Sequence, residues 1–193
     1  MQLIKFKILG DVVHGFSERG TDFSRENYDA LGIEKLAIAK QTHSDHILSV
    51  EKAGIYQDTD AFVTNVPGLA LTVRCADCQA VLLHDPVAGV VAAVHSGWRG
   101  NAQNIIGKTV RKMVEEYRCD PANIRAAIGP SLGTCCAEFS DPHEELPEFM
   151  HKYVDGKHVN LWQCAEDQLS EEGVKQIENS RICTACNTDR FYS

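Results

Sequence analysis

The sequence lacks the features of a membrane, secreted or nucleic-acid-binding protein. No apolar run approaches the roughly 20 residues that span a bilayer. The N-terminus alternates like a strand and has neither the long apolar stretch nor the small-residue cleavage site of a signal peptide. The formal net charge is −8 and no basic cluster occurs, which argues against a nucleic-acid backbone as partner. We therefore expect a cytoplasmic protein with neither nucleic acid nor membrane as partner.

Several cofactor patterns are also missing. The 14 glycines form no GxGxxG or P-loop motif, so a bound dinucleotide is not indicated. The eight histidines provide no His-x-His pairs, which a multicopper cluster would need. With a cytoplasmic location expected, the eight cysteines indicate thiols rather than a disulfide framework. The chain contains no internal repeat and no low-complexity segment.

Short apolar runs separated by polar turns predict a mixture of strands and helices. The length of 193 residues with 44% hydrophobic content suits one core, and we predict a single domain, 1–193. Strands are expected at 3–9, 36–40, 46–50, 60–64, 69–73, 80–83, 89–94 and 124–128. Helices are expected at 101–117, with Asn101 as its cap, at about 162–178, and as a short helix within the loop 141–158. This order predicts an α/β (α+β) fold, a layered mixed-sheet sandwich rather than a doubly wound parallel sheet.

Three residues near the ends of strand-like runs are candidate metal ligands. They are His43, Cys78 and His95, each beside a polar or glycine-rich stretch. One thiolate and two imidazoles with a fourth position open form the ligand set of a catalytic zinc. Taken alone, His43 is more often a polar loop histidine and Cys78 a small buried residue, whereas His95 ends an apolar run before a glycine turn, which places it well to face a cleft. The three spacings are not those of a compact zinc finger.

Two Cys-x-x-Cys pairs compete with this assignment. Cys75–Cys78 and Cys183–Cys186 lie more than 100 residues apart, far outside zinc-ribbon spacing. Alternation along an extended segment puts Cys75 and Cys78 on opposite faces, which indicates one ligand from that pair. The other cysteines are expected to be small turn, structural or surface residues: Cys119, Cys135, Cys136 and Cys164.

Seven short blocks spread over nearly the whole chain carry a family resemblance. They are His14-Gly15-Phe16-Ser17-x-Arg19, Lys40-Gln41-Thr42-His43, Asp60-Ala61-Phe62-Val63-Thr64, Ala76-Asp77-Cys78, His95-Ser96-Gly97-Trp98-Arg99-Gly100, Gly129-Pro130-Ser131-Leu132-Gly133-x-Cys135-Cys136 and Cys183-Thr184-x-x-Asn187. In this order they resemble the YfiH/YlmD family, which is labelled polyphenol oxidase or laccase domain and is similar to purine-nucleoside-cleaving enzymes.

The resemblance implies a fold, a site and an activity. The fold is a layered α/β sandwich, the zinc ligands are His43, Cys78 and His95, and Arg19 holds phosphate or substrate. The implied reactions are phosphorolysis of adenosine, inosine and methylthioadenosine, together with adenosine deamination. A copper-dependent phenol oxidase activity and a cell-wall editing role are also attributed to members of the family.

We predict a catalytic group of Cys78, His95 and Asp77. Zinc would lower the pKa of a bound water to about 7 and so supply a nucleophile at neutral pH. Asp77 is expected to orient a ligand or accept a proton, or else to be a structural carboxylate. Arg99 is expected to bind the anionic substrate or to brace its turn. We expect zinc rather than copper, a nucleoside and phosphate as small-molecule partners, and a monomer or weak homodimer.

Two other classes of function stay open. One is a metal-free hydrolase of cell-wall peptides with Cys78 as nucleophile and His95 as base. The other is a non-enzymatic interaction protein. The chain also departs from the family pattern. The segment between Arg19 and Lys40 is short, Cys75 stands where the family mostly has threonine, and the sequence stops at Ser193 before the family's last strand. These departures predict an altered substrate loop and an open or differently covered sheet edge.

Overall fold

The structure, a computed structural model, describes residues 3–21 and 25–193. Its strands are β1 (Leu3–Ile4), β2 (Phe16–Ser17), β3 (Lys35–Lys40), β4 (Ile47–Ser49), β5 (Gly54–Gln57), β6 (Ala61–Thr64), β7 (Leu69–Thr72), β8 (Gln79–Asp85), β9 (Val90–Ser96), β10 (Arg125–Ile128), β11 (Val154–Asp155), β12 (His158–Val159) and β13 (Gln176–Asn179). Its helices are η1 (Lys7–Leu9), α1 (Arg25–Ala30), α2 (Trp98–Ala102), α3 (Ile105–Tyr117), α4 (Pro142–Glu145), η2 (Glu148–Tyr153) and α5 (Leu161–Glu171), of which η1 and η2 are 3-10 helices. Within the described ranges no helix is both long and apolar enough to cross a membrane.

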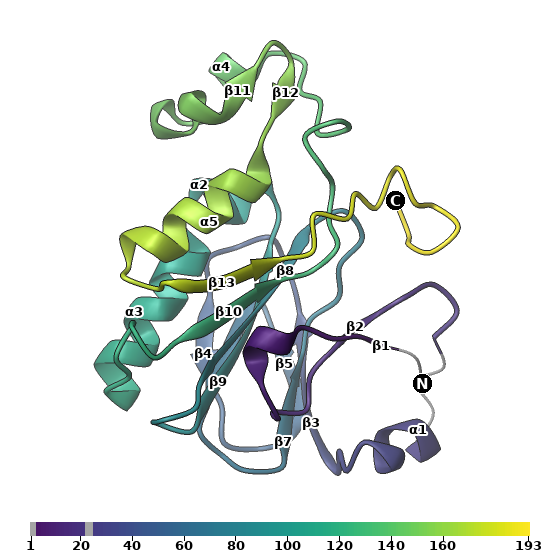
Figure 1. Cartoon of the computed structure of the whole chain (residues 1–193), viewed down its shortest axis with the longest axis vertical. Coiled ribbons are helices and arrows are strands. Elements are labelled where there is room, and N and C mark those ends of the chain that lie inside the picture. The colour runs from purple at the N-terminus through teal and green to yellow at the C-terminus, as the bar shows by residue number, and fades with distance from the viewer. Residues whose placement is uncertain (1–2, 22–24) are drawn as a thin grey trace.

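A six-stranded mixed sheet forms the centre of the molecule (Figure 1). Its order is β13-β10-β8-β9-β6-β4. β8 runs antiparallel to β9 and β10, and β9 runs antiparallel to β6, whereas the outer strands β13 and β4 run parallel to their neighbours. A separate three-stranded sheet, β5-β3-β7, is all parallel. These mixed sheets confirm the predicted α/β sandwich.

The two faces of the six-stranded sheet contact different layers. On β8, Val81 belongs to the cluster that includes α3 and α5, while Ala80 belongs to a cluster with the N-terminal segment. On β6, Val63 faces the helices and Phe62 packs with Ala37 of β3. Because successive strand residues point to opposite faces, this alternation makes the large sheet the middle of three layers.

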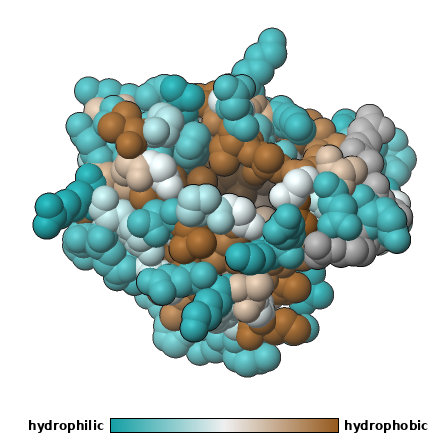
Figure 2. Space-filling view, turned by 90° about the horizontal axis from the view of Figure 1, so that it is seen from below, coloured by the Kyte–Doolittle hydropathy of each residue, from teal (hydrophilic) through white to brown (hydrophobic). Residues whose placement is uncertain are grey.

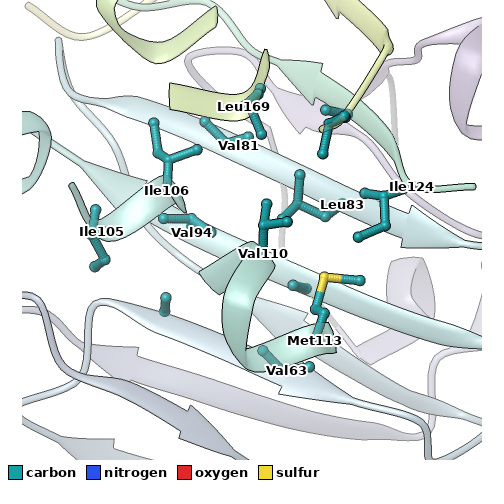
Figure 3. Close-up of a cluster of buried hydrophobic side chains, with 14 of the residues drawn as sticks. Val63, Val81, Leu83, Val94, Ile105, Ile106, Val110, Met113, Ile124 and Leu169 are labelled. Atoms are coloured by element: carbon teal, nitrogen blue, oxygen red, sulfur yellow. The ribbon is translucent and has the colours of Figure 1, made fainter. Parts of the chain in front are cut away.

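Helix α3 supplies much of the packing on the helical face (Figure 3). Ile106, Val110 and Met113 recur at helical spacing and are at most 1% exposed. Figure 3 shows Ile106 near Val94, Val110 near Leu83 and Met113 near Val63. Burial of each such side chain contributes roughly 1.5–3 kcal/mol, so this helix anchors the sheet from one side.

The surface at one end of the molecule is not uniformly polar. Figure 2 views the molecule from the end at which Figure 1 shows α1. Apolar side chains gather around a hollow near the centre of this view, and hydrophilic side chains surround them. The apolar interior therefore comes close to the surface at this end.

The helix predicted over 101–117 is two helices. Asn104 has a left-handed backbone with φ of 55°, and its side chain accepts a hydrogen bond from the backbone N–H of Gly107. The cap of α3 is therefore Asn104. Asn101 lies fully buried inside α2 and donates to Gln79 Oε1 at 2.8 Å, so its predicted role as cap was wrong.

The ends of the chain also differ from the prediction. The strand expected at 3–9 is limited to β1, because Phe6 and Leu9 turn inward at the three-residue spacing of the 3-10 helix η1. The helix expected at 162–178 ends at Glu171, since Gly173 adopts a φ of 91° that stops it. Residues 176–179 instead form β13.

Most of the remaining predictions agree with the structure within a few residues. The strands predicted in 36–94 correspond to β3, β4, β6, β7, β8 and β9, and 124–128 corresponds to β10. The segment 141–158 contains the expected short helix, α4, together with η2 and β11. The sequence did not predict α1, β2 or β5, which are short and lack a strong apolar pattern.

The cap gives a stability prediction. We expect Asn104→Ala to lower the free energy of unfolding by about 1–2 kcal/mol, because it removes the cap and puts alanine at a positive φ. Asn104→Gly is expected to lower the free energy of unfolding by only a few tenths of a kcal/mol, since glycine is acceptable at a cap position and adopts a positive φ without strain. Urea denaturation measures both changes, and equal losses in the two variants would contradict this account of the cap.

Candidate metal centre

The three predicted ligands lie at one end of the six-stranded sheet. Cys78 immediately precedes β8, and His95 lies in β9, opposite Ala80 in the antiparallel register. His43 follows β3 on a loop that bonds to Asp60, which stands just before β6. Because β8 and β6 begin where β9 ends, these side chains converge. Their ligand atoms all lie within 4.8 Å of one another.

The geometry of this group suits a single metal ion. Cys78 Sγ lies 3.8 Å from His43 Nε2, and the rings of His43 and His95 have centroids 4.8 Å apart at 82°. Zn–N and Zn–S bonds of about 2.0–2.3 Å allow two ligands of one ion to be this far apart. His95 is 3% exposed, whereas His43 is exposed, so the group is open to solvent on the His43 side.

A buried carboxylate lies behind the two histidines. Asp60 is fully buried. Its Oδ1 accepts hydrogen bonds from His95 Nδ1 at 2.7 Å and from the backbone N–H of His43 at 3.1 Å. Its Oδ2 accepts from the backbone N–H groups of Thr42 and Ser44 and from the Ser44 hydroxyl. Asp60 therefore fixes both the loop that carries His43 and the ring of His95.

The ionisation of Asp60 and His95 favours metal binding. Burial works to raise the pKa of Asp60, but its hydrogen bonds outweigh burial and lower that pKa, so the carboxylate is ionised. Burial lowers the pKa of His95 despite the neighbouring Asp60, so its ring is neutral. With Nδ1 donating to the carboxylate, the Nε2 lone pair of His95 is left for a metal.

The thiol of Cys78 needs a cation to become a thiolate. Burial raises its pKa, and the nearby carboxylates of Asp77 and Asp60 raise it further. The thiolate is the form that attacks substrates or binds metals. A metal ion at this position would supply the missing positive charge.

The backbone around the three residues has positive φ at two positions and approaches them closely at a third. His43 and Asp77 have positive φ values, 61° and 69°, which non-glycine residues seldom adopt. A Cβ at Gly97 would lie 2.8 Å from Cys78 Sγ and 3.3 Å from His43 Cδ2. Only glycine leaves room for the ligands there. Among the described non-glycine residues with positive φ, His43 and Asp77 lie in this group or next to it, whereas Asn104 and Arg118 are helix caps.

The other predicted site residues have partners of their own. Asp77 Oδ1 accepts a hydrogen bond from the Thr184 hydroxyl at 2.7 Å. Arg19 donates through Nε and a terminal nitrogen to the backbone oxygen of Phe191, at 3.2 and 2.9 Å. Its guanidinium also lies over the Tyr192 ring. None of these groups belongs to the three-residue cluster, and their catalytic roles stay predictions.

Arg99 and Cys75 also lie outside the three-residue group. Arg99 is exposed on α2 and stacks over the ring of its neighbour Trp98, 4.2 Å from the centroid. Cys75 packs with the apolar N-terminal cluster and not with the ligands. Asp60 was missed as a site residue, although an aspartate directly before a fully buried strand gave a signal that could have found it.

Comparison with known proteins places the chain in a family. The family described as "multi-copper polyphenol oxidoreductase laccase" matches residues 14–193. The chain belongs to this family. A protein named purine nucleoside phosphorylase from Clostridium acetobutylicum is 36% identical over 181 residues, covering 90% of this chain and 75% of that protein. One of the same name from Corynebacterium glutamicum is 38% identical over 182 residues, covering 84% and 71%.

Solved structures agree with this assignment. The hypothetical protein YfiH of Bacillus licheniformis matches with a TM-score of 0.77 and 30% identity, over 87% of this chain and 72% of that one. YlmD from Geobacillus stearothermophilus matches with a TM-score of 0.78 and 26% identity, over 88% and 72%. The resemblance to the YfiH/YlmD family is thereby confirmed, and with it the predicted fold.

The buried carboxylate generates the first site prediction. Asp60→Asn replaces Oδ1 or Oδ2 by an NH2 group that cannot accept a hydrogen bond, which leaves donors of the 42–44 loop or of His95 unpaired. We expect metal affinity to fall by about 10–100-fold, measured by chelator competition, because partners behind the ligands orient them. Asp155→Asn, an exposed aspartate on β11, is the control. Unchanged metal affinity in Asp60→Asn would refute this role.

Gly97 generates the second site prediction. Gly97→Ala is expected to abolish tight metal binding, since its Cβ would overlap Cys78 Sγ. The backbone of Gly97 is extended (φ −77°), so the fold should persist. Gly54→Ala is the matched control, because its Cβ would meet only ordinary contacts at 3.6 Å or more. Metal content and circular dichroism check both variants, and full metal occupancy in Gly97→Ala would exclude this packing constraint.

Proposed function

We propose that the protein is a zinc-dependent purine nucleoside phosphorylase that also deaminates adenosine. The names of the relatives from Clostridium acetobutylicum and Corynebacterium glutamicum support the phosphorylase activity. The observation that carries the proposal is the convergence of His43, Cys78 and His95 on one point with solvent access on one side. Three ligands with an open position are the arrangement of a catalytic zinc rather than a structural one.

The metal and the protein side chains have separate tasks in this proposal. Zinc held by His43, Cys78 and His95 would act as a Lewis acid toward an oxygen of the bound substrates or water. Asp60 holds the ring of His95 in the tautomer that leaves Nε2 free. Asp77, held by Thr184, positions the turn that carries Cys78. Asp60 and Asp77 thus act by positioning the ligands and not by touching the substrate.

The phosphorolysis needs a phosphate held near the ribose. A phosphate oxygen forms a bond to C1′ of the ribose while the bond from C1′ to N9 of the purine breaks, and the base leaves with a proton. Arg99 is our candidate to hold phosphate, because it is exposed directly after the glycine turn that follows His95. Arg19, already bonded to Phe191, would bind phosphate or substrate through its remaining donors.

Other substrates follow from the same proposal. Inosine, adenosine and methylthioadenosine share the purine and the ribose C1′ at which the bond breaks. Deamination of adenosine would replace the amino group at C6 by oxygen from water and release ammonia. Both reactions use one nucleoside site, and they differ in whether phosphate or water attacks.

A metal-free cysteine hydrolase fits the site less well. Cys78 does have an imidazole nearby, at 3.8 Å from His43 Nε2. However, burial and two carboxylates raise the pKa of the thiol, whereas a cysteine nucleophile needs a lowered one.

Copper oxidase chemistry is the alternative that the family description suggests. Within the described residues, the groups that can hold a metal are the His43–Cys78–His95 set and a set of four cysteines. Coupled copper centres use many imidazoles, and neither set provides them. One thiolate and two imidazoles do suit a single copper ion, so a metal analysis is part of the test.

Product analysis tests this proposal. Protein of known metal content is incubated with inosine and with adenosine, with and without phosphate, and products are identified by mass spectrometry. We expect hypoxanthine and ribose-1-phosphate from inosine only when phosphate is present. No nucleoside consumption by protein whose zinc is shown to occupy the group of His43, Cys78 and His95 would overturn the proposal.

A matched pair of histidine variants tests the assignment of ligands. His43→Asn keeps a residue that tolerates the positive φ but removes the imidazole, and we expect it to lose at least about 100-fold in kcat/KM. His46→Asn, in the same exposed loop and outside the ligand set, is the control. Equal activity of the two variants would exclude His43 as a ligand.

A further inference from the structure

Four cysteines that the proposed function does not use gather at the surface. The Sγ atoms of Cys135, Cys136, Cys183 and Cys186 all lie within 4.8 Å of one another. Cys186 Sγ lies 3.5 Å from the Sγ atoms of both Cys135 and Cys136. These distances are far beyond the 2.03–2.05 Å of a disulfide, and all four are free thiols.

The topology of the sheet brings the two cysteine pairs together. β10 and β13 are parallel neighbours, so the loops that follow them leave the same end of the sheet. Beyond the strands, Ser131 forms a bridge with Cys183, and the backbone N–H of Thr184 donates to the Ser131 carbonyl. A turn at Gly133 then aims Cys135 and Cys136 toward the second pair.

We propose that these four cysteines bind one zinc ion in a closed, structural site. Four thiolates are a complete tetrahedral ligand set for zinc and leave no position for substrate. Zn–S bonds of about 2.3 Å put tetrahedral sulfur atoms roughly 3.8 Å apart, close to the spacing found here. The backbone N–H of Gly133 also donates to Cys183 Sγ at 3.3 Å, the kind of support that orients a ligand.

The ion would fasten the C-terminal segment to the body of the protein. After β13 the described chain contains no further helix or strand up to residue 193. Cys183 and Cys186 begin this segment, and Cys135 and Cys136 belong to the loop after β10. The site therefore ties two loops that are otherwise joined by a few backbone hydrogen bonds.

Two hydrogen bonds connect the loops of the four-cysteine site to the turn that carries Cys78. Thr184 lies between the two cysteines of the second pair, and its hydroxyl donates to Asp77 Oδ1 at 2.7 Å. Asp77 directly precedes Cys78. The backbone oxygen of Asp77 also accepts from the N–H of Leu132, in the other loop of the four-cysteine site. Both loops thus hold the turn that presents Cys78.

Metal binding by these four cysteines does not require the proposed nucleoside chemistry, and the test reads the two metal groups separately. The full chain is purified reduced and without oxygen, loaded with Zn²⁺ or Co²⁺, and analysed for metal content and absorption spectrum. The variants are Cys186→Ser, Cys135→Ser and Cys78→Ser, with Cys119→Ser, outside both metal groups, as control. Circular dichroism confirms that each variant folds.

We expect two bound ions in the wild type and in Cys119→Ser. Cys186→Ser and Cys135→Ser should each lose one ion together with the intense thiolate-to-Co²⁺ charge-transfer band of a four-thiolate tetrahedral site. Cys78→Ser should keep that band. If the site of His43, Cys78 and His95 binds no metal, the wild type and Cys78→Ser will both bind one ion with this spectrum, so the two failures are distinguishable.

Hydrogen exchange gives a second readout that does not depend on activity. Adding a chelator or mutating Cys186 should speed amide exchange at Thr184, whose N–H bonds to Ser131. Metal content in Cys186→Ser equal to that of the wild type would overturn the proposal. So would a reduced chain that takes up no Co²⁺ with thiolate absorption, or a disulfide among these cysteines that persists under reducing conditions.

Discussion

The site depends on the hydrogen bonds that the buried carboxylate of Asp60 accepts. An ionised carboxylate without water is costly unless it is fully hydrogen-bonded. Here the donors come from the 42–44 loop and from His95, so the need to satisfy one charge folds the loop, holds His43 at a positive φ and selects the tautomer of His95. The same hydrogen bonds therefore fold the 42–44 loop and orient the side chains of His43 and His95.

The strand directions explain why so many loops meet at this place. β8 and β6 begin, and β9, β10 and β13 end, at one end of the six-stranded sheet. Three of these strand ends carry or support the candidate ligands His43, Cys78 and His95, and the other two lead to the four cysteines. The helices α3 and α5 pack on one face and make this end a rigid support. The side chains of both groups already lie close together at this end, so binding a metal ion would require no movement of the sheet.

The sequence predicts those features that depend on local pattern. Continuous apolar runs located β8 and β9, and the polar residues that flank the apolar runs include the three side chains that the structure brings together. Local pattern did not show where α3 begins, because the choice between Asn101 and Asn104 depends on what is buried against α2. It also did not pair Cys135 and Cys136 with Cys183 and Cys186, because that pairing requires the parallel register of β10 and β13.

Anomalous X-ray diffraction from crystals of the purified protein, recorded on both sides of the zinc and copper absorption edges, tests the central claim most directly. The account predicts a zinc-specific peak between His43 Nε2, Cys78 Sγ and the Nε2 of His95, with the Nδ1 of His95 still bonded to Asp60. A copper-specific peak there, or no peak there in protein that contains two zinc ions per chain, would contradict it.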